Sequence, residues 1–500
     1  MNIKTIITKV SLLAAAALMS TACLEKLPGD FILWEDAMQT ISDARQTRTG
    51  IYSTMKNPAL FSGALTLAPD IQTDLVYAVE GNSNVYGDIW QWKTLSTTSE
   101  VEAVYAGLYQ LIGRCNFYLD KVDQVKDNTF VDEELDELDQ YTGEVKGIRA
   151  FAYSELLKMY CKAYKPETAA DELGVVIRTR YFVKEPVKRA SLKDSYDFVI
   201  KELEEAEKLL DEDQDRFDKV SFTQAAVRAL HARVSLYMRD WDNAIKYSTY
   251  LIDSENFMLS SVNETRVPQG NFDYMWTNDS SVEVIFKVGF TPTSMGGSLG
   301  SIFLNFPNDF TFFYPDYVPA QSALRLFGAS DLRYQSYFEE LQTGYPHQLK
   351  WPLLIKYFGN EAFVAQHIFH VNMPKPFRLA EQYLIRAEAY CNKGWYSQAS
   401  TDLSTLSKSR HSNGGAVAVN PDNWLDIISD ERVKELYMEG FRLNDLKRWE
   451  RGFERQMQAN VQKSGATLKI SADNPLFVWP IPKHELESPG SEILPNESNK

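Results

Sequence analysis

A helix–turn–helix pattern occurs twice in this chain, in the same register. In the later copy, small or apolar residues between 378 and 393 recur at spacings of three and four, which is the period of an amphipathic helix, and Gly394 ends the pattern. A shift of 155 positions carries the earlier copy onto it, so that Ala232 falls on Ala387 and Trp241 falls on Tyr396. The two copies therefore predict two helical hairpins of one design.

The contact positions of each hairpin suit two closely packed helices. Alanines let the helix backbones approach, and the aromatic residue after the turn, followed three positions later by alanine, packs the second helix onto the first. The hairpins resemble tetratricopeptide repeats, but no contiguous array is visible, so we expect a helical scaffold that is interrupted by insertions. Further helices are predicted over 148–160 and 195–210, and the acidic run 132–139 indicates a solvated helix face.

The character of the sequence changes between about 255 and 351. Residues 282–286 alternate like a β-strand, and the sequence around them is rich in glycine, proline, asparagine and aromatic residues. Such a segment cannot stack as helical repeats, and loops on a rigid scaffold are where binding groups usually lie. The chain has 10 Trp, 26 Tyr and 27 Phe, so some rings must lie on the surface, where they can stack on planar or sugar-like ligands.

The first 22 residues have the features of a signal peptide. Lys4 and Lys9 form a short positive region, an apolar run too short to span a bilayer follows, and small residues precede Cys23. This order resembles a bacterial lipoprotein signal, in which the leader is removed and acyl chains are attached to the cysteine. Ser20 stands where a larger aliphatic residue is usual, so a plain secretory leader is the alternative. The remaining cysteines, an odd number in an exported chain, have apolar surroundings that predict buried thiols: Cys115, Cys161 and Cys391.

The charge balance and the missing catalytic signatures limit the function. The chain has 52 Lys and Arg against 68 Asp and Glu, a net charge of −16 that becomes −18 without the leader, and this argues against binding to a nucleic-acid backbone. No nucleotide-binding loop or metalloprotease motif is present, and we expect neither a cofactor nor a metal. Ser298 lies in a Gly-x-Ser-x-Gly pattern, but residues 291–293 separate it from the predicted strand, so a flexible loop is expected. His367 and His370 lack a third metal ligand of suitable spacing.

The densest charged segment runs from Glu431 to Trp449. On a helix the acids at 431, 435 and 439 share one face, with Arg432 and Arg442 three or four positions from acids, so ion pairs can join this helix to its neighbours. Interlocked opposite charges keep carboxylates ionised, which does not suit a general acid. We therefore predict a structural ion-pair network and no catalytic residue. A glycosidase pair of carboxylates elsewhere stays open, because the two acids need only be close in space.

The same segment resembles the carboxy-terminal signature of the SusD/RagB family, the outer-membrane glycan-binding lipoproteins of Bacteroidetes. Tyr105 departs from the family pattern, in which many members carry tryptophan. The resemblance extends along most of the chain, in the family's order and spacing, to the runs 143–153 and 378–390, to Tyr109 with Ile112 and Asn116, to Asp331 with Arg333, and to Trp479-Pro-Ile-Pro482.

The resemblance implies a mostly helical, SusD-like fold with tetratricopeptide-like hairpins and an irregular, loop-rich region that has a few short strands. We divide the chain into a leader (1–22), a lipidated tether (23–40), an N-terminal helical part (41–254) and a C-terminal part (255–500) with the ligand face and the signature. The resemblance further implies a lipid anchor at Cys23 on the outer membrane, facing outward. It also implies a SusC-type TonB-dependent transporter as the partner, and capture of oligosaccharides without catalysis. Peptide binding, as in RagB-like importers, and glycoside hydrolysis are the alternatives.

The ligand residues of this family follow no fixed motif, so candidates are chosen from two aromatic clusters. For each ring the alternative is a side chain that is buried or faces the transporter. The mature charge suits neutral or amine-bearing glycans better than sulfated ones. The candidates are Asn82, Tyr86, Trp90 and Trp92 in the first cluster, and Tyr274, Trp276 and Tyr314 in the second.

Overall fold

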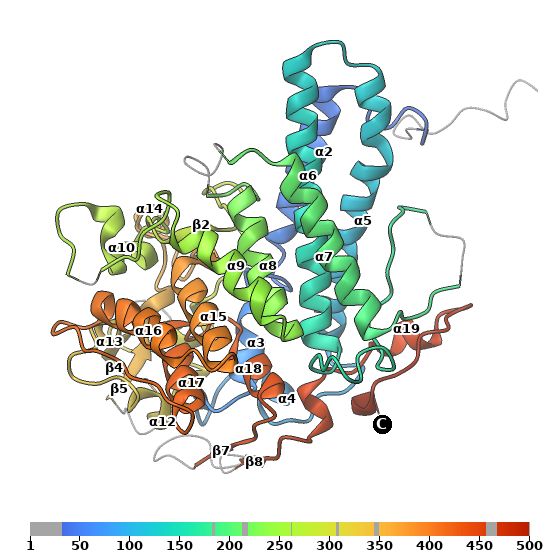
Figure 1. The fold of residues 1–500 in the computed structure, drawn as a ribbon. Coiled ribbons are helices and arrows are strands. Elements are labelled where there is room, and N and C mark those ends of the chain that lie inside the picture. Colours follow the sequence, from blue (N-terminus) through green and yellow to red (C-terminus); the bar gives the residue numbers. More distant parts are fainter. Residues whose placement is uncertain are drawn as a thin grey trace, which may run out of the picture.

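The computed structural model describes residues 33–182, 186–212, 219–261, 263–306, 310–344, 350–456 and 468–499. The predicted signal peptide, Cys23 and the first part of the predicted tether lie outside these residues. The fold is mostly helical, with a loop-rich part beside the helices, and the predicted fold class is confirmed (Figure 1). The three predicted buried thiols are confirmed, since each of these cysteines is free and buried.

The scaffold helices pack on one another in an extended stack (Figure 1). Its helices are α2 (Ile41–Met55), α5 (Ser99–Asp127), α6 (Asp132–Tyr160), α7 (Leu192–Leu209), α8 (Gln224–Met238), α9 (Trp241–Ile252), α15 (Leu379–Asn392), α16 (Tyr396–Arg410), α17 (Trp424–Glu435) and α18 (Arg442–Arg448). α6 packs between α5 and α7, and α8 packs on α7 and α9. Both predicted hairpins are confirmed, as α8–α9 and α15–α16.

Local sequence signals fix where several of these helices begin. Thr40 and Asp43 form a reciprocal capping box at the start of α2, and the Ser191 side chain accepts a hydrogen bond from the backbone of Asp194 at the start of α7. The predicted helix over 148–160 is the second half of α6, and the acidic run forms the largely solvated first turns of the same helix.

The helical stack continues across a long insertion. α9 ends at Ile252 and α15 begins at Leu379, yet the two helices pack directly on each other. Side chains from both hairpins share one buried cluster: Ala232, Leu236, Ala244, Tyr247, Ile385 and Ala389. Residues 253–378, called the insertion below, therefore leave the stack and return to it, as the interrupted repeat pattern predicts.

The insertion holds short elements joined by loops. These are η2 (Pro268–Gly270), α10 (Phe272–Thr277), β2 (Val284–Phe286), α11 (Ser301–Leu304), β3 (Tyr317–Pro319), α12 (Gln321–Leu324), α13 (Arg333–Tyr337), β4 (Phe338–Gln342), β5 (Lys350–Leu354), η3 (Ile355–Tyr357), α14 (Glu361–Val364) and β6 (Phe377–Arg378). The predicted strand at 282–286 is shorter as β2, and all its residues are buried, so it has no solvent side to produce the alternation that the sequence suggests.

The remaining short elements come from both ends of the chain. They are α3 (Ala64–Ile71), β1 (Val76–Ala78), α4 (Gly87–Trp90), β7 (Phe453–Arg455), β8 (Leu468–Ile470), η4 (Pro475–Phe477), α19 (Lys483–Glu487) and η5 (Glu497–Asn499). Antiparallel pairs form between β1 and β3, β2 and β6, β4 and β5, and β7 and β8. In the first pair, Val76 lies opposite Pro319 and Ala78 opposite Tyr317, so the N-terminal part is joined to the insertion.

One apolar core crosses the predicted division at 254/255. Phe151 of α6 contacts Phe377 of β6, with ring centroids 5.1 Å apart, and Phe222 contacts Phe286 at the same distance. Near the C-terminus, the backbone N–H of Trp479 donates to a carbonyl at the end of α6. The two predicted parts are therefore packed into one body, which holds the loops of the insertion in place.

Candidate functional site

The structure brings part of the second aromatic cluster next to the first. The carboxylate of Asp316 accepts hydrogen bonds from the backbone N–H and the hydroxyl of Ser83, at 2.5 and 2.7 Å. These bonds, together with the β1–β3 pairing, hold the segment after β1 against the segment before β3. Three of the predicted ligand residues therefore lie in one region: Asn82, Tyr86 and Tyr314.

Two loops near these residues are among the places where non-glycine residues adopt left-handed backbone conformations. A φ near +60° is uncommon for residues other than glycine, and it persists only where the surroundings impose it. Such conformations gather at binding sites and switches more often than elsewhere. In the loop after β1 they occur at Asn84, Tyr86 and Trp92, and in the loop after α14 they occur at His367 and His370.

Trp90 and Trp92 are core residues, which corrects their prediction as ligand contacts. Trp90 is fully buried, its indole N–H donates to the carbonyl of Val76 at 3.2 Å, and the guanidinium of Arg455 lies 4.5 Å from its ring centroid. Trp92 is 7% exposed, and its indole N–H donates to a backbone carbonyl at the end of α3. Neither ring has a free face for a sugar, because protein groups already occupy its surroundings.

Trp276 is also a core residue, and the prediction that it binds ligand is corrected in the same way. Only 3% of it is exposed, and the ammonium group of Lys356 lies 4.1 Å from its ring centroid. Tyr274 lies on the same short helix and is half-buried. α10 packs against α13 and η3, whereas the backbone of Tyr314 is bonded to the residue that follows α11.

A cluster of phenylalanines that the sequence pattern did not predict lies beside Tyr314. Phe306 and Phe310 have ring centroids 4.4 Å apart, and Phe369 lies 5.3 Å from the first and 5.4 Å from the second. Phe358 completes this phenylalanine cluster at 5.8 Å from Phe310, which is 50% exposed. The backbone N–H of Tyr314 donates to the carbonyl next to Phe306. The many aromatic residues between 306 and 314 indicate an aromatic cluster in the sequence, but nothing in the sequence predicts that Phe369 joins it.

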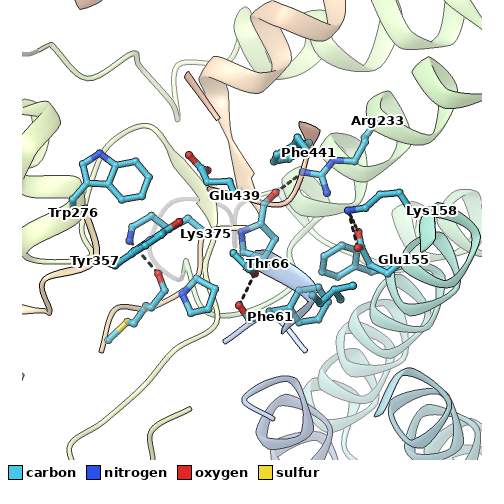
Figure 2. Close-up of a pocket in the computed structure, with 15 residues that line it drawn as sticks. Phe61, Thr66, Glu155, Lys158, Arg233, Trp276, Tyr357, Lys375, Glu439 and Phe441 are labelled. Atoms are coloured by element: carbon cyan, nitrogen blue, oxygen red, sulfur yellow. Dashed lines mark hydrogen bonds and ion pairs between the residues drawn. The ribbon is translucent and has the colours of Figure 1, made fainter. Parts of the chain in front are cut away.

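A polar cavity lies inside the molecule, where the insertion meets the helical stack. Its volume is about 40 Å³, which has room for a few waters and is far too small for a sugar ring. Figure 2 shows the aromatic and charged side chains around it, among them Trp276, Lys375, Glu439, Arg233 and Lys158. This cavity is suited to water and not to an oligosaccharide.

A larger hollow opens at the surface between α2, α6 and the chain that joins α7 to α8. Its volume is about 510 Å³, which falls in the range of small-molecule sites. Acids dominate its lining, including Glu133, Asp136 and Glu137, and Tyr141 contributes an aromatic ring. The hollow could bond hydroxyl or amino groups, but it lacks the several adjacent rings found in the phenylalanine cluster.

The charged signature forms a buried ion-pair network, as predicted. The carboxylate of Glu435 accepts hydrogen bonds from Arg333 at 2.8 Å, from Arg378 at 2.9 Å and from two nitrogens of Arg410 at 3.0 Å. Arg378 and Arg410 also pair with Glu283 of the insertion. Burial alone would raise the pKa of Glu435, but the three guanidinium groups outweigh it and hold that pKa well below its usual value. The network therefore holds its acids ionised.

The other sequence patterns have structural explanations. The hydroxyl of Ser298 donates to the carbonyl of His370 and not to an imidazole, and no strand leads into this serine. Gly300 follows in the same loop because a Cβ there would lie 1.9 Å from the carbonyl oxygen of Tyr357. His367 is exposed while His370 is largely buried, and the described residues contain no group of three acids, histidines or cysteines that could hold a metal ion.

The sequence matches two related family models. Residues 46–236 match a model described as "Starch-binding associating with outer membrane", and residues 334–491 match the model of the SusD family. The chain belongs to the SusD family. A SusD-like protein of Formosa agariphila is 23% identical over 425 residues, which is 77% of each chain.

Solved SusD structures confirm the fold. A SusD superfamily protein of Bacteroides thetaiotaomicron superposes with a TM-score of 0.78 at 22% identity, over 91% of this chain and 99% of that one. A putative sugar-binding protein of Bacteroides vulgatus gives a TM-score of 0.75 at 23% identity, over 93% and 100% of the two chains. None of the helices described for this SusD protein has both the length and the apolar character needed to cross a bilayer.

Proposed function

We propose that this SusD protein is a lipid-anchored, cell-surface protein that captures oligosaccharides and passes them to a SusC-type TonB-dependent transporter without cleaving them. The observation that carries the proposal is the phenylalanine cluster on the insertion, which is half-buried except for the exposed Phe310 and lies next to Tyr314 and the strained loop of Tyr86. We interpret this cluster as a sugar-binding surface because one of the matching family models is described as starch-binding.

The chemistry of this region suits a sugar better than a small charged ligand. The flat faces of Phe310 and Tyr314 can pack on the C–H face of a pyranose ring, while neighbouring amide and carboxylate groups bond its hydroxyls. Amide and carboxylate groups of this region include Asn305, whose carbonyl accepts a hydrogen bond from the backbone N–H of Tyr314, and Asn82 and Asp316, which also bond within the protein.

The acids of the protein support a binding role over hydrolysis. Asp70 is the described carboxyl group whose pKa burial raises to about 7, the value a general acid needs at neutral pH. Asp70 is fully buried, and its carboxylate accepts hydrogen bonds from the backbone N–H groups of Gly440 and Arg442. It therefore stabilises the turn after α17 and does not face a ligand. The acids of the ion-pair network are held ionised by arginines.

The proposed location rests on Cys23 and on the family. Acyl chains on Cys23 would anchor the mature protein, and several chains on one residue give stable attachment without a membrane-spanning helix. One matching family model is described as associating with the outer membrane. Oligosaccharide captured at the cell surface must still cross the outer membrane. A protein that binds without cleaving therefore needs a transporter to which it passes the ligand.

The experiment measures binding and cleavage in the same samples. The mature protein is run through gels that contain different polysaccharides, mixed with a peptide panel, and assayed for new reducing ends. We expect retardation by one class of glycan without release. Phe310→Ala should weaken binding, whereas Tyr250→Ala, which removes a ring of similar exposure on α9, should not. Release of reducing ends would make the protein a hydrolase, and peptide binding alone would place it with RagB-like importers.

A further inference from the structure

Four aromatic rings form an exposed patch where the described chain begins. Trp34 stacks on Tyr181 with ring centroids 5.6 Å apart, and it meets Phe117 and Phe182 edge-on at 5.6 and 4.9 Å. Phe182 is 66% exposed and Tyr181 is 45% exposed. These four residues are called the aromatic patch below. Burial in the core does not account for them, because their outer faces remain in water.

The aromatic patch is held on α5 by directional contacts. The carboxylate of Asp120 accepts hydrogen bonds from the backbone N–H of Tyr181 and from the side chain of Arg180, at 2.8 and 2.9 Å. The ammonium group of Lys121 lies 4.3 Å from the ring centroid of Trp34. The rings are thus presented in a fixed arrangement, so contact with a partner costs little ordering entropy.

A second exposed apolar group lies at the same end of α5. Phe130 and Val131, in the turn between α5 and α6, are 91% and 47% exposed. Gln124, in the last turns of α5, donates a hydrogen bond to the carbonyl of Glu35, which ties the start of the described chain to this end of the helix. Figure 1 shows the turn at the top of the view and the start of the described chain beside the upper part of α5.

The length of the tether limits how far the start of the described chain can lie from the membrane. From Cys23 to Leu33 there are ten residue steps, which span at most ~36 Å when fully extended. If Cys23 carries acyl chains, the aromatic patch is confined to that distance from the lipid surface. Trp and Tyr side chains favour the membrane–water interface, where the ring is buried and the polar tip stays wet.

We propose that the aromatic patch, together with Phe130, contacts the lipid headgroup region of the membrane and so orients the protein on the surface to which it is anchored. The proposal rests on the lipid anchor of the proposed function. Exposed acids outnumber exposed bases along the segments of the patch and the end of α5, with Glu35, Asp36, Asp123 and Asp127 against Arg180. Contact therefore depends on ring insertion between neutral headgroups, and anionic lipid weakens it.

The test separates the aromatic patch from the acyl chains. The mature chain, residues 23–500, is made with Cys23→Ser so that it cannot be acylated, and its co-sedimentation with phosphatidylcholine vesicles is measured. The double variant Tyr181→Ser with Phe182→Ser should lower partitioning about ten-fold, since it removes two large rings from the contact. Tyr250→Ser, which removes a ring of similar exposure from α9, should leave partitioning unchanged.

A spin label reports the orientation directly. The three cysteines of the described chain are buried, so Val131→Cys can be labelled selectively in the folded protein. On vesicles we expect the label at position 131 to become accessible to oxygen in the lipid, while a label at Lys193→Cys, at the start of α7, stays in water. Equal partitioning of the double variant and the parent overturns the proposal, as does binding that requires anionic lipid.

Acylation is read out separately. The mass of the protein extracted from cell membranes shows whether Cys23 carries acyl chains. An unmodified mass overturns the lipid anchor of the proposed function. If the mass shows acyl chains but the unacylated Cys23→Ser parent does not bind vesicles, only the membrane contact of the aromatic patch is overturned.

Discussion

Replacing Glu435 by glutamine should strongly destabilise the protein. The side chain is fully buried and accepts four hydrogen bonds from three arginines, all of which are themselves buried. Glutamine removes the negative charge and turns one acceptor oxygen into an N–H₂ donor that faces guanidinium donors. Removing one partner of a buried ion pair costs about 3–5 kcal/mol, and we expect a loss of unfolding free energy in that range.

Urea denaturation followed by tryptophan fluorescence measures this loss. Asp197→Asn is the matched control, because it removes a carboxylate from an exposed pair with Lys193 on α7. Exposed pairs of this spacing contribute about 0.3–0.5 kcal/mol, so the control should stay close to the parent protein. If Glu435→Gln also unfolded within about 1 kcal/mol of the parent, the network would not be a source of stability and the reasoning from burial would be refuted.

The same carboxylate predicts a pH dependence. Its pKa in the folded protein lies well below the usual value of 4.5, so its contribution to stability is fully present above pH 4.5 and is lost as the pH falls toward the folded value. The unfolding free energy of the parent should therefore fall as the pH drops below 4.5. Glu435→Gln lacks this group and should show a shallower fall over the same interval.

Three further changes test other parts of the structure. Trp90→Ala empties a fully buried site and should cost about 3–5 kcal/mol in urea titrations, while the folded fraction keeps its glycan affinity. Lys447 has its pKa lowered to about 7 by burial, so the unfolded chain binds more protons between pH 7 and 10.5. Stability should rise with pH over that interval in the parent and rise less steeply in Lys447→Met, which keeps the similarly buried Lys356, as denaturation midpoints at pH 7 and 9 will show. Gly300→Ala would place a Cβ 1.9 Å from the carbonyl oxygen of Tyr357, so thermal unfolding should reveal a loss of about 1–3 kcal/mol.

The helical scaffold is predictable because its information is local. The period of apolar residues places α8, α9, α15 and α16, and the shared register of the two copies indicates that their hairpins are alike. Alanine at a contact position indicates that another helix packs closely there, whether that helix is near or distant in the sequence. The interrupted repeat pattern therefore favours hairpins that stack across an insertion, and the packing of α9 on α15 agrees with it.

The candidate ligand residues are less predictable because their exposure is decided by distant residues. Trp90 and Tyr86 lie in one short segment, but Arg455 comes from far along the chain to cover the first ring, while the second stays half-buried. In the same way, Phe310 becomes part of an aromatic cluster only because the fold brings Phe369 beside it. Counting rings in a segment shows that a site is near, and only tertiary contacts show which rings remain available.

The ion-pair network explains how such loops are held without a large sheet. The insertion has only short strands among its described residues, so backbone pairing gives it little rigidity. Arg333 and Glu283 of the insertion instead pair with charged groups of α16 and α17 in the helical stack. Arginine forks on buried carboxylates are directional and costly to break, so they fix the insertion at its base. The outer loops are then carried on a base that is fixed without their own backbone pairing.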